Sequence, residues 1–292
     1  MELIKVKITP YSSFVTFPKG DAIFGHFAYN SFLNGEDTFK NYANEKEPKI
    51  IFSDILPDNH FYKPTLPLKD FGIDESEKKE FRKKSWIEIS DFQNNKLQNA
   101  KELSFIKTEI KTRNSLNRVS FTTDDSGMFA PYSIEEINFI CQPVIYVLFD
   151  KKAFTKEQIV ERLNVIGKVG FGKKGSIGKG HFKAEIDKHF DKFDEVESEY
   201  YMTLSPTILH KSKDVIEKAY YNTFNRFGKH HSSSTPFKKP LLMADSGAVV
   251  KFKPKKKREW IGGGIENGIS TQSIVQGYSI VVPFIFERGQ DG

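Results

Sequence analysis

The chain has 292 residues, of which 38% are hydrophobic and 28% charged, and its net charge is +6; this composition is typical of a folded globular protein of about two domains and excludes wholesale disorder. Its single cysteine, Cys141, excludes a disulfide framework or a cysteine-based zinc cluster and indicates a reducing, intracellular compartment. No apolar run approaches the roughly 20 residues of a membrane-spanning helix, and the first ten residues lack the apolar block of a signal peptide, so we expect a cytoplasmic protein with no membrane partner.

The first predicted elements are a strand and a helix. Residues 2–9 alternate between apolar and lysine side chains, which predicts a strand. Asp21 is a favourable N-cap for a helix that runs through Leu33, and Asn34-Gly35 supplies its stop signal. The chain therefore opens in the order β–α.

Residues 36–135 contain short strand-like pieces separated by polar, proline-rich or lysine-rich connections. The pieces are Lys49–Phe52, Phe61–Tyr62, Trp86–Ile89, Phe105–Ile110 and Arg118–Thr122. We interpret this block as the middle of a first domain that is extended by a long insertion, including an exposed hairpin.

A second β–α–β unit follows. Residues 138–149 form the strongest strand pattern, in which Pro143 indicates an edge or a bulge. Thr155 begins a helix with a capping box completed by Gln158. A glycine-rich loop at Gly170–Gly180 and a strand at His181–Ile186 come next. With the opening β–α, this is the split βαβ order of a ferredoxin-like domain.

The last third of the chain predicts a separate domain. Residues 187–198 are charged and resemble a linker. From Tyr200 onward the sequence is mostly strand-like, and we expect a second, smaller α+β domain. Residues 1–150 carry 19 basic and 22 acidic side chains, whereas residues 151–292 carry 25 and 16. The net charge of +9 on the second half suits a polyanion.

The glycine loop is the first candidate site. It holds five glycines, three lysines and a serine in eleven residues. It follows a helix, which is the reverse of a dinucleotide-binding loop, and it lacks the P-loop pattern. Glycines let backbone N–H groups approach a phosphate, and Lys173, Lys174 and Lys179 supply positive charge. The alternative is a flexible surface loop.

Two further basic segments are candidates. Lys111–Arg118 combines arginines, which suit phosphates, with asparagines, which suit base edges or sugar hydroxyls; its alternative is a solvated hairpin tip. Lys251–Arg258 with Trp260 beside it combines charge with an aromatic ring for stacking. Such a run is more often a solvated loop.

The histidines form no metal-binding pattern, and no catalytic acid pair or nucleophile motif is present, so we expect neither a metal nor a cofactor. His26 lies within the first predicted helix, and no partner that would make it a catalytic base is evident. We favour a packed or RNA-contacting role for it.

Together these features resemble the RAMP superfamily of CRISPR proteins. The resemblance rests on the Gly20–His26 segment of the first helix, the Arg113–Arg118 segment, the glycine loop and the Gly277–Pro283 strand. The resemblance covers nearly the whole chain. Within the superfamily, the layout of the chain is most similar to the Csm-complex subunits that cap the crRNA 5′ end in type III-A effectors.

That resemblance implies a fold of two ferredoxin-like (RRM-like) α+β domains. The first, residues 1–190, would carry a long inserted β-hairpin thumb around residues 85–130 and the glycine loop at 170–180. The second, residues 191–292, would be a degenerate copy.

It also implies a non-catalytic subunit of an antiviral ribonucleoprotein. The subunit would grip the crRNA 5′ tag and bridge the large Palm/HD-domain Csm subunit to the backbone RAMP subunit. The residues expected to contact RNA are Lys19, His26, Arg113, Asn114, Asn117, Arg118, Gly170, Gly172, Lys173, Lys174, Gly175, Ser176, Gly178, Lys179, Gly180, Lys255, Lys256 and Arg258.

Two other functions stay open at this point. CRISPR repeat-processing endoribonucleases share the fold and use a histidine near the first helix, so His26 keeps a metal-independent nuclease as the alternative. More than 100 residues follow the glycine loop here, which argues against it because that loop lies near the C-terminus of those nucleases. The third is a generic RRM-like RNA binder, but the aromatic RNP signature is missing.

Overall fold

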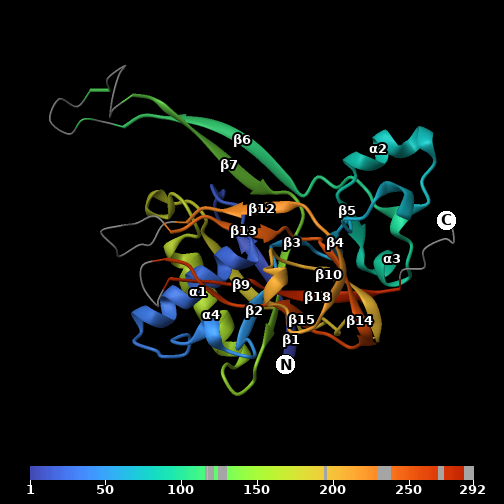
Figure 1. Ribbon diagram of the computed structural model, residues 1–292. Helices are drawn as coiled ribbons and strands as arrows, with labels where there is room; N and C mark the ends of the chain where they lie inside the picture. Colours follow the sequence, from blue (N-terminus) through green and yellow to red (C-terminus); the bar gives the residue numbers. More distant parts are fainter. Residues whose placement is uncertain are drawn as a thin grey trace.

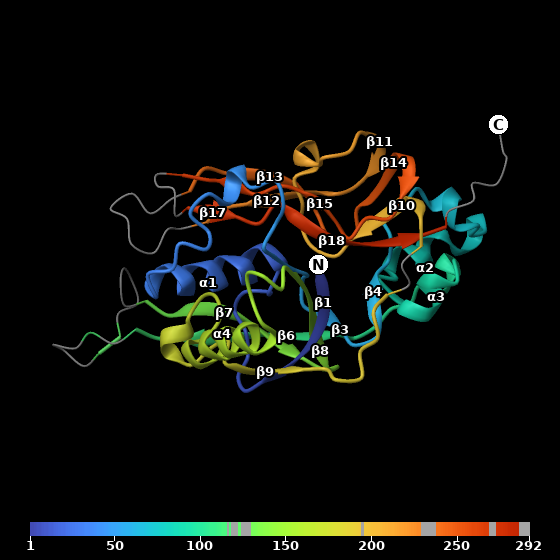
Figure 2. The same cartoon turned by 90° about the horizontal axis from the view of Figure 1, so that it is seen from below.

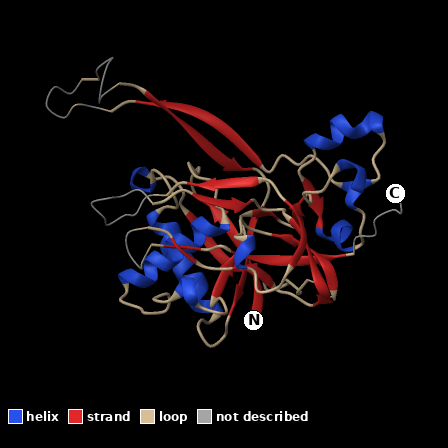
Figure 3. Cartoon of the chain, viewed as in Figure 1, coloured by secondary structure: helices blue, strands red, loops and turns tan. Residues whose placement is uncertain are grey.

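The computed structural model describes residues 1–115, 117, 122–123, 130–193, 196–228, 238–268 and 273–285. The chain forms two antiparallel five-stranded sheets with two long helices and two projecting parts, a hairpin and a small lobe (Figure 1). Most of the regular structure is strand, as Figure 3 shows. The expected mixed α and β class is therefore confirmed. No helix in the described ranges is long and apolar enough to cross a membrane.

The first sheet has the order β2-β8-β1-β9, and β3 also pairs with β8. One face carries Ile8 and Ile145, which lie with Ile23 and Leu163 around a shared apolar space, so this face is covered by the two long helices. The elements are β1 (Glu2–Pro10), α1 (Gly20–Leu33), β2 (Ile50–Phe52), β3 (Leu56–Pro57), β8 (Pro143–Phe149), α4 (Lys156–Val169) and β9 (Phe182–Ile186).

The opposite face of the first sheet is also covered. Tyr146 is fully buried on this face, and the rings of Phe61, Phe190 and Phe193 lie between 4.9 and 6.2 Å from its own. The charged segment predicted as a linker therefore packs two partly buried phenylalanines against the core. Because RRM-type domains stack bases on an open sheet face, this sheet offers no such platform.

The second sheet has the order β11-β14-β10-β18-β15. Four of its strands repeat an arrangement of the first sheet: β14 lies between β11 and β10 as β8 lies between β2 and β1, and β18 pairs with β10 as β9 pairs with β1. The described part of residues 191–292 contains no α-helix. Its strands are β10 (Ser198–Thr203), β11 (Ile216–Tyr220), β12 (Thr223–Arg226), β13 (Leu241–Ala244), β14 (Val249–Lys256), β15 (Trp260–Gly262), β16 (Ile265–Glu266), β17 (Ile274–Val275) and β18 (Tyr278–Phe284).

The two halves share one core. The side chain of Gln276 is buried and pairs with the backbone of Phe52, accepting from its N–H at 2.9 Å and donating to its carbonyl at 2.8 Å. The rings of Tyr42 and Tyr278 meet edge to face at 5.8 Å. The Gln276 bonds satisfy buried polar groups across the junction, as a stable interior requires, and the two rings add apolar contact.

The projecting hairpin pairs β6 (Ile106–Arg113) with β7 (Tyr132–Phe139) over eight residue pairs and extends away from the body (Figure 1). It begins later than the predicted insertion at residue 85. The preceding segment instead forms a lobe against the body, with β4 (His60–Tyr62), α2 (Lys78–Lys83), β5 (Trp86–Glu88) and α3 (Ile89–Gln93). Figure 3 shows α2 and α3 apart from the two long helices.

Two local predictions were wrong. The single strand expected over residues 138–149 is two strands, because the chain leaves the hairpin at Ile140 and enters the sheet at Pro143. Proline is tolerated there because the first residue of a strand can lack an N–H. The N-cap of α1 is Lys19 rather than Asp21, whose side chain is buried in the first turn beside Arg226. The predicted capping box of α4, Thr155 with Gln158, is present.

Candidate nucleic-acid interface

The glycine loop closes on itself directly after α4. The N–H of Phe171 donates to the carbonyl of Gly180 at 2.8 Å, and the N–H of Gly180 donates to the carbonyl of Ser13 at 2.9 Å. A Cβ atom at Gly170 would lie 2.5 Å from the carbonyl oxygen of Lys179, and both Gly170 and Gly180 have positive φ. These two glycines are therefore required by the loop's own fold, whatever it binds.

The middle of the loop presents backbone donors. Lys174 has a left-handed conformation, with φ of 66°, and a single 3-10 turn follows at Gly175–Ile177. Within the described residues, the N–H groups of Lys174, Gly175 and Ser176 have no acceptor. Three consecutive donors that begin at a left-handed residue form the kind of backbone nest that accepts an anion.

A buried carboxylate joins this loop to the projecting hairpin. Glu136 on β7 lies 2.7 Å from Lys179 Nζ, 3.0 Å from Arg113 NH2 and 3.3 Å from Lys111 Nζ. Ser13 Oγ also donates to it at 2.7 Å. Burial would raise the pKa of Glu136, but these four partners outweigh it and lower the pKa to about 2. Three cations thus surround one anion, and the cluster keeps a positive excess.

His26 on α1 contacts the same loop. Its Nε2 accepts a hydrogen bond from the N–H of Gly172 at 3.2 Å, and its ring lies 4.7 Å from that of Phe171. A ring nitrogen that accepts from a backbone N–H must give up that bond before it can take a proton from a substrate. The structure thus shows His26 positioning the loop.

The other loop lysines face the hairpin and the turn after β1. The N–H of Lys173 donates to Thr16 Oγ1 at 3.1 Å. Lys174 Nζ lies 4.7 Å from the centre of the ring of Tyr132, the first residue of β7. The predicted loop residues, His26 and Arg113 are therefore gathered on one face.

The hairpin tip holds the remaining predicted residues of this group. Asn114 is exposed, and the N–H of Asn117 donates to the carbonyl of Thr122 at 3.1 Å. Arg118 lies outside the described residues.

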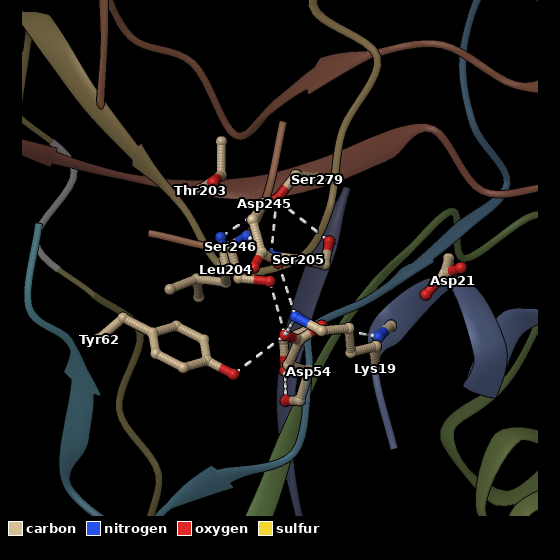
Figure 4. Close-up of polar contacts among 12 residues, drawn as sticks. Lys19, Asp21, Asp54, Tyr62, Thr203, Leu204, Ser205, Asp245, Ser246 and Ser279 are labelled. Carbon is tan, nitrogen blue, oxygen red and sulfur yellow. Dashed lines mark hydrogen bonds and ion pairs between the residues drawn. The ribbon is translucent and has the colours of Figure 1, made fainter. Parts of the chain in front are cut away.

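Lys19 belongs to a different environment, at the junction of the two halves (Figure 4). Its ammonium group lies 2.6 Å from Asp245 and 3.4 Å from the fully buried Asp54. Asp54 also accepts from Tyr62 at 3.0 Å and from Ser246 at 2.6 Å. Lys19 therefore takes part in an inter-half ion pair.

Most of the basic run at Lys251–Arg258, up to Lys256, is strand β14 rather than the loop favoured by its composition. Lys256 and Arg258 pair with Asp214 at 2.6 and 2.8 Å, and the Arg258 guanidinium lies 4.3 Å from the ring of Phe252. Lys255 is exposed on the same strand. Figures 1 and 2 place β14 far from α4 and its glycine loop, so these residues do not join the face described above.

Sequence reasoning missed Glu136, Thr16 and Arg226. Glu136 follows another glutamate in the alternating strand of residues 132–139, and that alternation placed it on the inner face. A buried acidic residue in a strand flanked by basic segments was the available signal. Nothing in the sequence indicated which cations it would meet.

No protein-family model matches the chain, and no curated protein is significantly similar to it in sequence. Its fold is found among solved structures. A chain of the crystal structure of a Csm1-Csm4 cassette in complex with cA4 aligns over 98% of this chain and 99% of its own length, with a TM-score of 0.64 and 18% identity. A chain of a Csm3-Csm4 subcomplex of the type III-A CRISPR-Cas interference complex aligns over 97% and 99%, with a TM-score of 0.62 and 20% identity. The likeness therefore extends over the whole fold.

Proposed function

We propose that this chain is a Csm4-like RAMP subunit of a type III-A CRISPR effector, and that it binds the 5′ tag of the crRNA without cleaving it. The whole-length likeness to structures whose common component is Csm4 supports the assignment. The observation that carries the RNA-binding role is the convergence of the glycine loop, α1 and the β6–β7 hairpin on one basic face.

The two domains of this proposal follow the sheets. Residues 1–190 form a ferredoxin-like domain and residues 191–292 a degenerate copy. The repeated strand order in the two sheets supports this division, and loops and short strands replace the helices in the second copy. The β6–β7 hairpin is the thumb.

Phosphates of the tag are bound by the glycine loop. Lys173 and Lys174 supply charge, and the backbone nest at residues 174–176 supplies donors. Arg113 is the last residue of β6, and its pairing with Glu136 fixes its guanidinium beside Lys179. This arrangement suits a chain of phosphates that runs from the loop toward the thumb.

The protein partners are the large Palm/HD-domain subunit and a backbone RAMP subunit. Structures of related chains with Csm1 and with Csm3 support this choice. The chain would be co-expressed with each candidate partner, with and without crRNA, and purified through a tag on the partner. Recovery of the chain with both partners supports the bridging role, and recovery with neither contradicts it.

The RNA role is tested with the purified chain and a labelled crRNA precursor in the absence of metal. A native gel reports binding and a denaturing gel reports cleavage. We expect a shifted, uncut RNA, and we expect Lys173→Ala with Lys174→Ala to weaken the shift. A discrete cut that disappears in His26→Ala would establish the nuclease instead.

A further inference from the structure

Gly25 is a glycine in the middle of α1 for which the described structure provides no packing reason. A Cβ atom built there would meet nothing within 4 Å. Its neighbour in sequence is His26, and Tyr29 lies one turn further along the same exposed side. Glycine in a helix interior is less favourable than alanine. A bare helix surface at this position therefore suits close approach by a ligand.

Two cationic elements flank this open position. Asp21, one turn before Gly25, has its Oδ2 2.7 Å from Arg226 Nε on β12. His26, one residue after Gly25, holds Gly172 of the glycine loop. Asp21 and His26 are five residues apart, or about 7.5 Å along the helix axis.

The β12–β13 hairpin lies on the other side of α1 from the glycine loop. Figure 2 shows α1 between β12 and β13 on one side and α4 on the other. Near Arg226, Lys238 is half-buried, and burial together with Arg226 lowers the pKa of its ammonium group. Asp21 is the acidic group that faces this pair of cations. An anion that approached from solvent would relieve their repulsion.

This hairpin also carries exposed apolar side chains. Phe227 is 71% exposed and Leu242 is 63% exposed. An aromatic ring beside a basic cluster is the combination that holds single-stranded nucleic acid by stacking and charge. Neither residue is among the candidate site residues of the sequence analysis.

We propose that the RNA backbone crosses α1 at Gly25 and that the β12–β13 hairpin, through Arg226, Lys238 and Phe227, forms the second wall of its path. The glycine loop forms the first wall. This inference rests on the proposed RNA-binding function and extends it to a surface of the second half. The occupant is a single strand, because its phosphates meet the cations while its unpaired bases reach Phe227.

The test uses the full chain and a fluorescein-labelled single-stranded RNA that carries a repeat-derived 5′ tag. Gly25→Ala is expected to raise Tm by about 1–3 °C, since alanine favours the helix and meets open space. The same variant is expected to weaken RNA binding at least tenfold. Val165→Ala on α4 is the matched control, because it also improves helix propensity at a partly exposed site but should leave RNA affinity unchanged.

Lys238→Ala and Phe227→Ala test the wall itself. Lys238→Ala should make the slope of log Kobs against log salt shallower by about 0.7. Phe227→Ala should weaken binding with the slope unchanged, because it removes stacking rather than a phosphate contact.

The outcomes distinguish a failure of the RNA path over α1 from a failure of the proposed RNA-binding function. Wild-type affinity in Gly25→Ala, Lys238→Ala and Phe227→Ala, with binding lost in Lys173→Ala/Lys174→Ala, would overturn the path over α1 and leave the RNA-binding function standing. A lower Tm in Gly25→Ala would also overturn it, because the position would then not be open. No binding of the tag RNA by the wild-type chain would instead remove the proposed function.

Discussion

A Cβ atom at Gly180 would lie 2.3 Å from the carbonyl oxygen of Phe171, so the two ends of the glycine loop approach more closely than any other residue type allows. Gly178 in the same loop also has positive φ but would meet nothing within 4 Å. A comparison of substitutions at Gly178 and Gly180 therefore distinguishes the strain of a left-handed conformation from a clash with the backbone.

We expect Gly178→Ala to cost about 1 kcal/mol, from the left-handed conformation alone. Gly180→Ala carries the same strain and a backbone clash in addition, and we expect a loss of 3 kcal/mol or more. Urea unfolding of both variants measures the difference. Equal losses would show that the loop opens to accommodate a side chain at Gly180.

Glu136→Gln should destabilise the protein by about 1–3 kcal/mol, because Lys179 and Arg113 lose the negative charge that joins the glycine loop to the hairpin. Their partial exposure to water limits the loss. Thermal unfolding checks this value. Glu135→Gln on the same strand is the control, because that side chain is exposed, and it should leave Tm unchanged.

The effect of Glu136 should depend on pH. Its pKa in the folded state, about 2, is below the ordinary value of 4.5, so its contribution is complete above about pH 4.5 and is lost as pH falls toward 2. The difference in unfolding free energy between wild type and Glu136→Gln should therefore be constant at pH 5–7 and shrink below pH 4.5. A difference that does not vary with pH would contradict the charged role of Glu136.

The contribution of Asp21 to stability should depend on pH in the opposite sense. Burial raises its pKa from 3.8 to about 6, and Arg226 only partly counters the effect. Its contribution to stability is therefore complete below about pH 4 and is lost as pH rises through 6. The stability of wild type relative to Asp21→Asn should fall between pH 4 and pH 6. Denaturant titrations at each pH measure this, and a rising difference would contradict it.

Lys173→Ala with Lys174→Ala should make the salt dependence of tag-RNA binding shallower by about 1.4, since about 0.7 is lost for each phosphate contact with a single strand. Lys152→Ala is the matched control, because Lys152 is exposed before the start of α4 and the helix separates it from the loop by about 20 Å. An unchanged slope in the double variant would remove both lysines from the phosphate site. Lys179→Ala should lower Tm as well, because it also breaks the pair with Glu136.

Asp54→Asn should cost about 3–5 kcal/mol, because the buried carboxylate accepts from Lys19, Tyr62, Ser246 and the N–H of Gly20. The side-chain amide nitrogen of asparagine is itself a donor, so it cannot accept from the donors that one carboxylate oxygen of Asp54 now meets. Tyr62→Phe removes one of these bonds and should cost about 1 kcal/mol. Chemical denaturation measures the loss of unfolding free energy in each variant. Equal losses in Asp54→Asn and Tyr62→Phe would show that Asp54 does not organise the junction.

The local elements were predictable because their signals are local. The alternation in residues 2–9, the capping box at Thr155 and the Asn34-Gly35 stop all depend on residues within a few positions of each other, and all three elements are present. The glycine loop was recognisable for the same reason. Asp21 failed as an N-cap because a contact with Arg226, 205 positions later in the chain, outweighed its local preference.

The sequence by itself determined the alternation of strands and helices, the glycine loop and the basic character of the second half. Only the tertiary structure decided which cations are paired with carboxylates and which face the solvent together. Lys19, Lys179 and Arg258 look alike in sequence, yet each meets a different carboxylate: Asp245, Glu136 and Asp214. The Coulomb interaction depends on distance in space, and the fold brings together residues that lie tens to hundreds of positions apart in the chain.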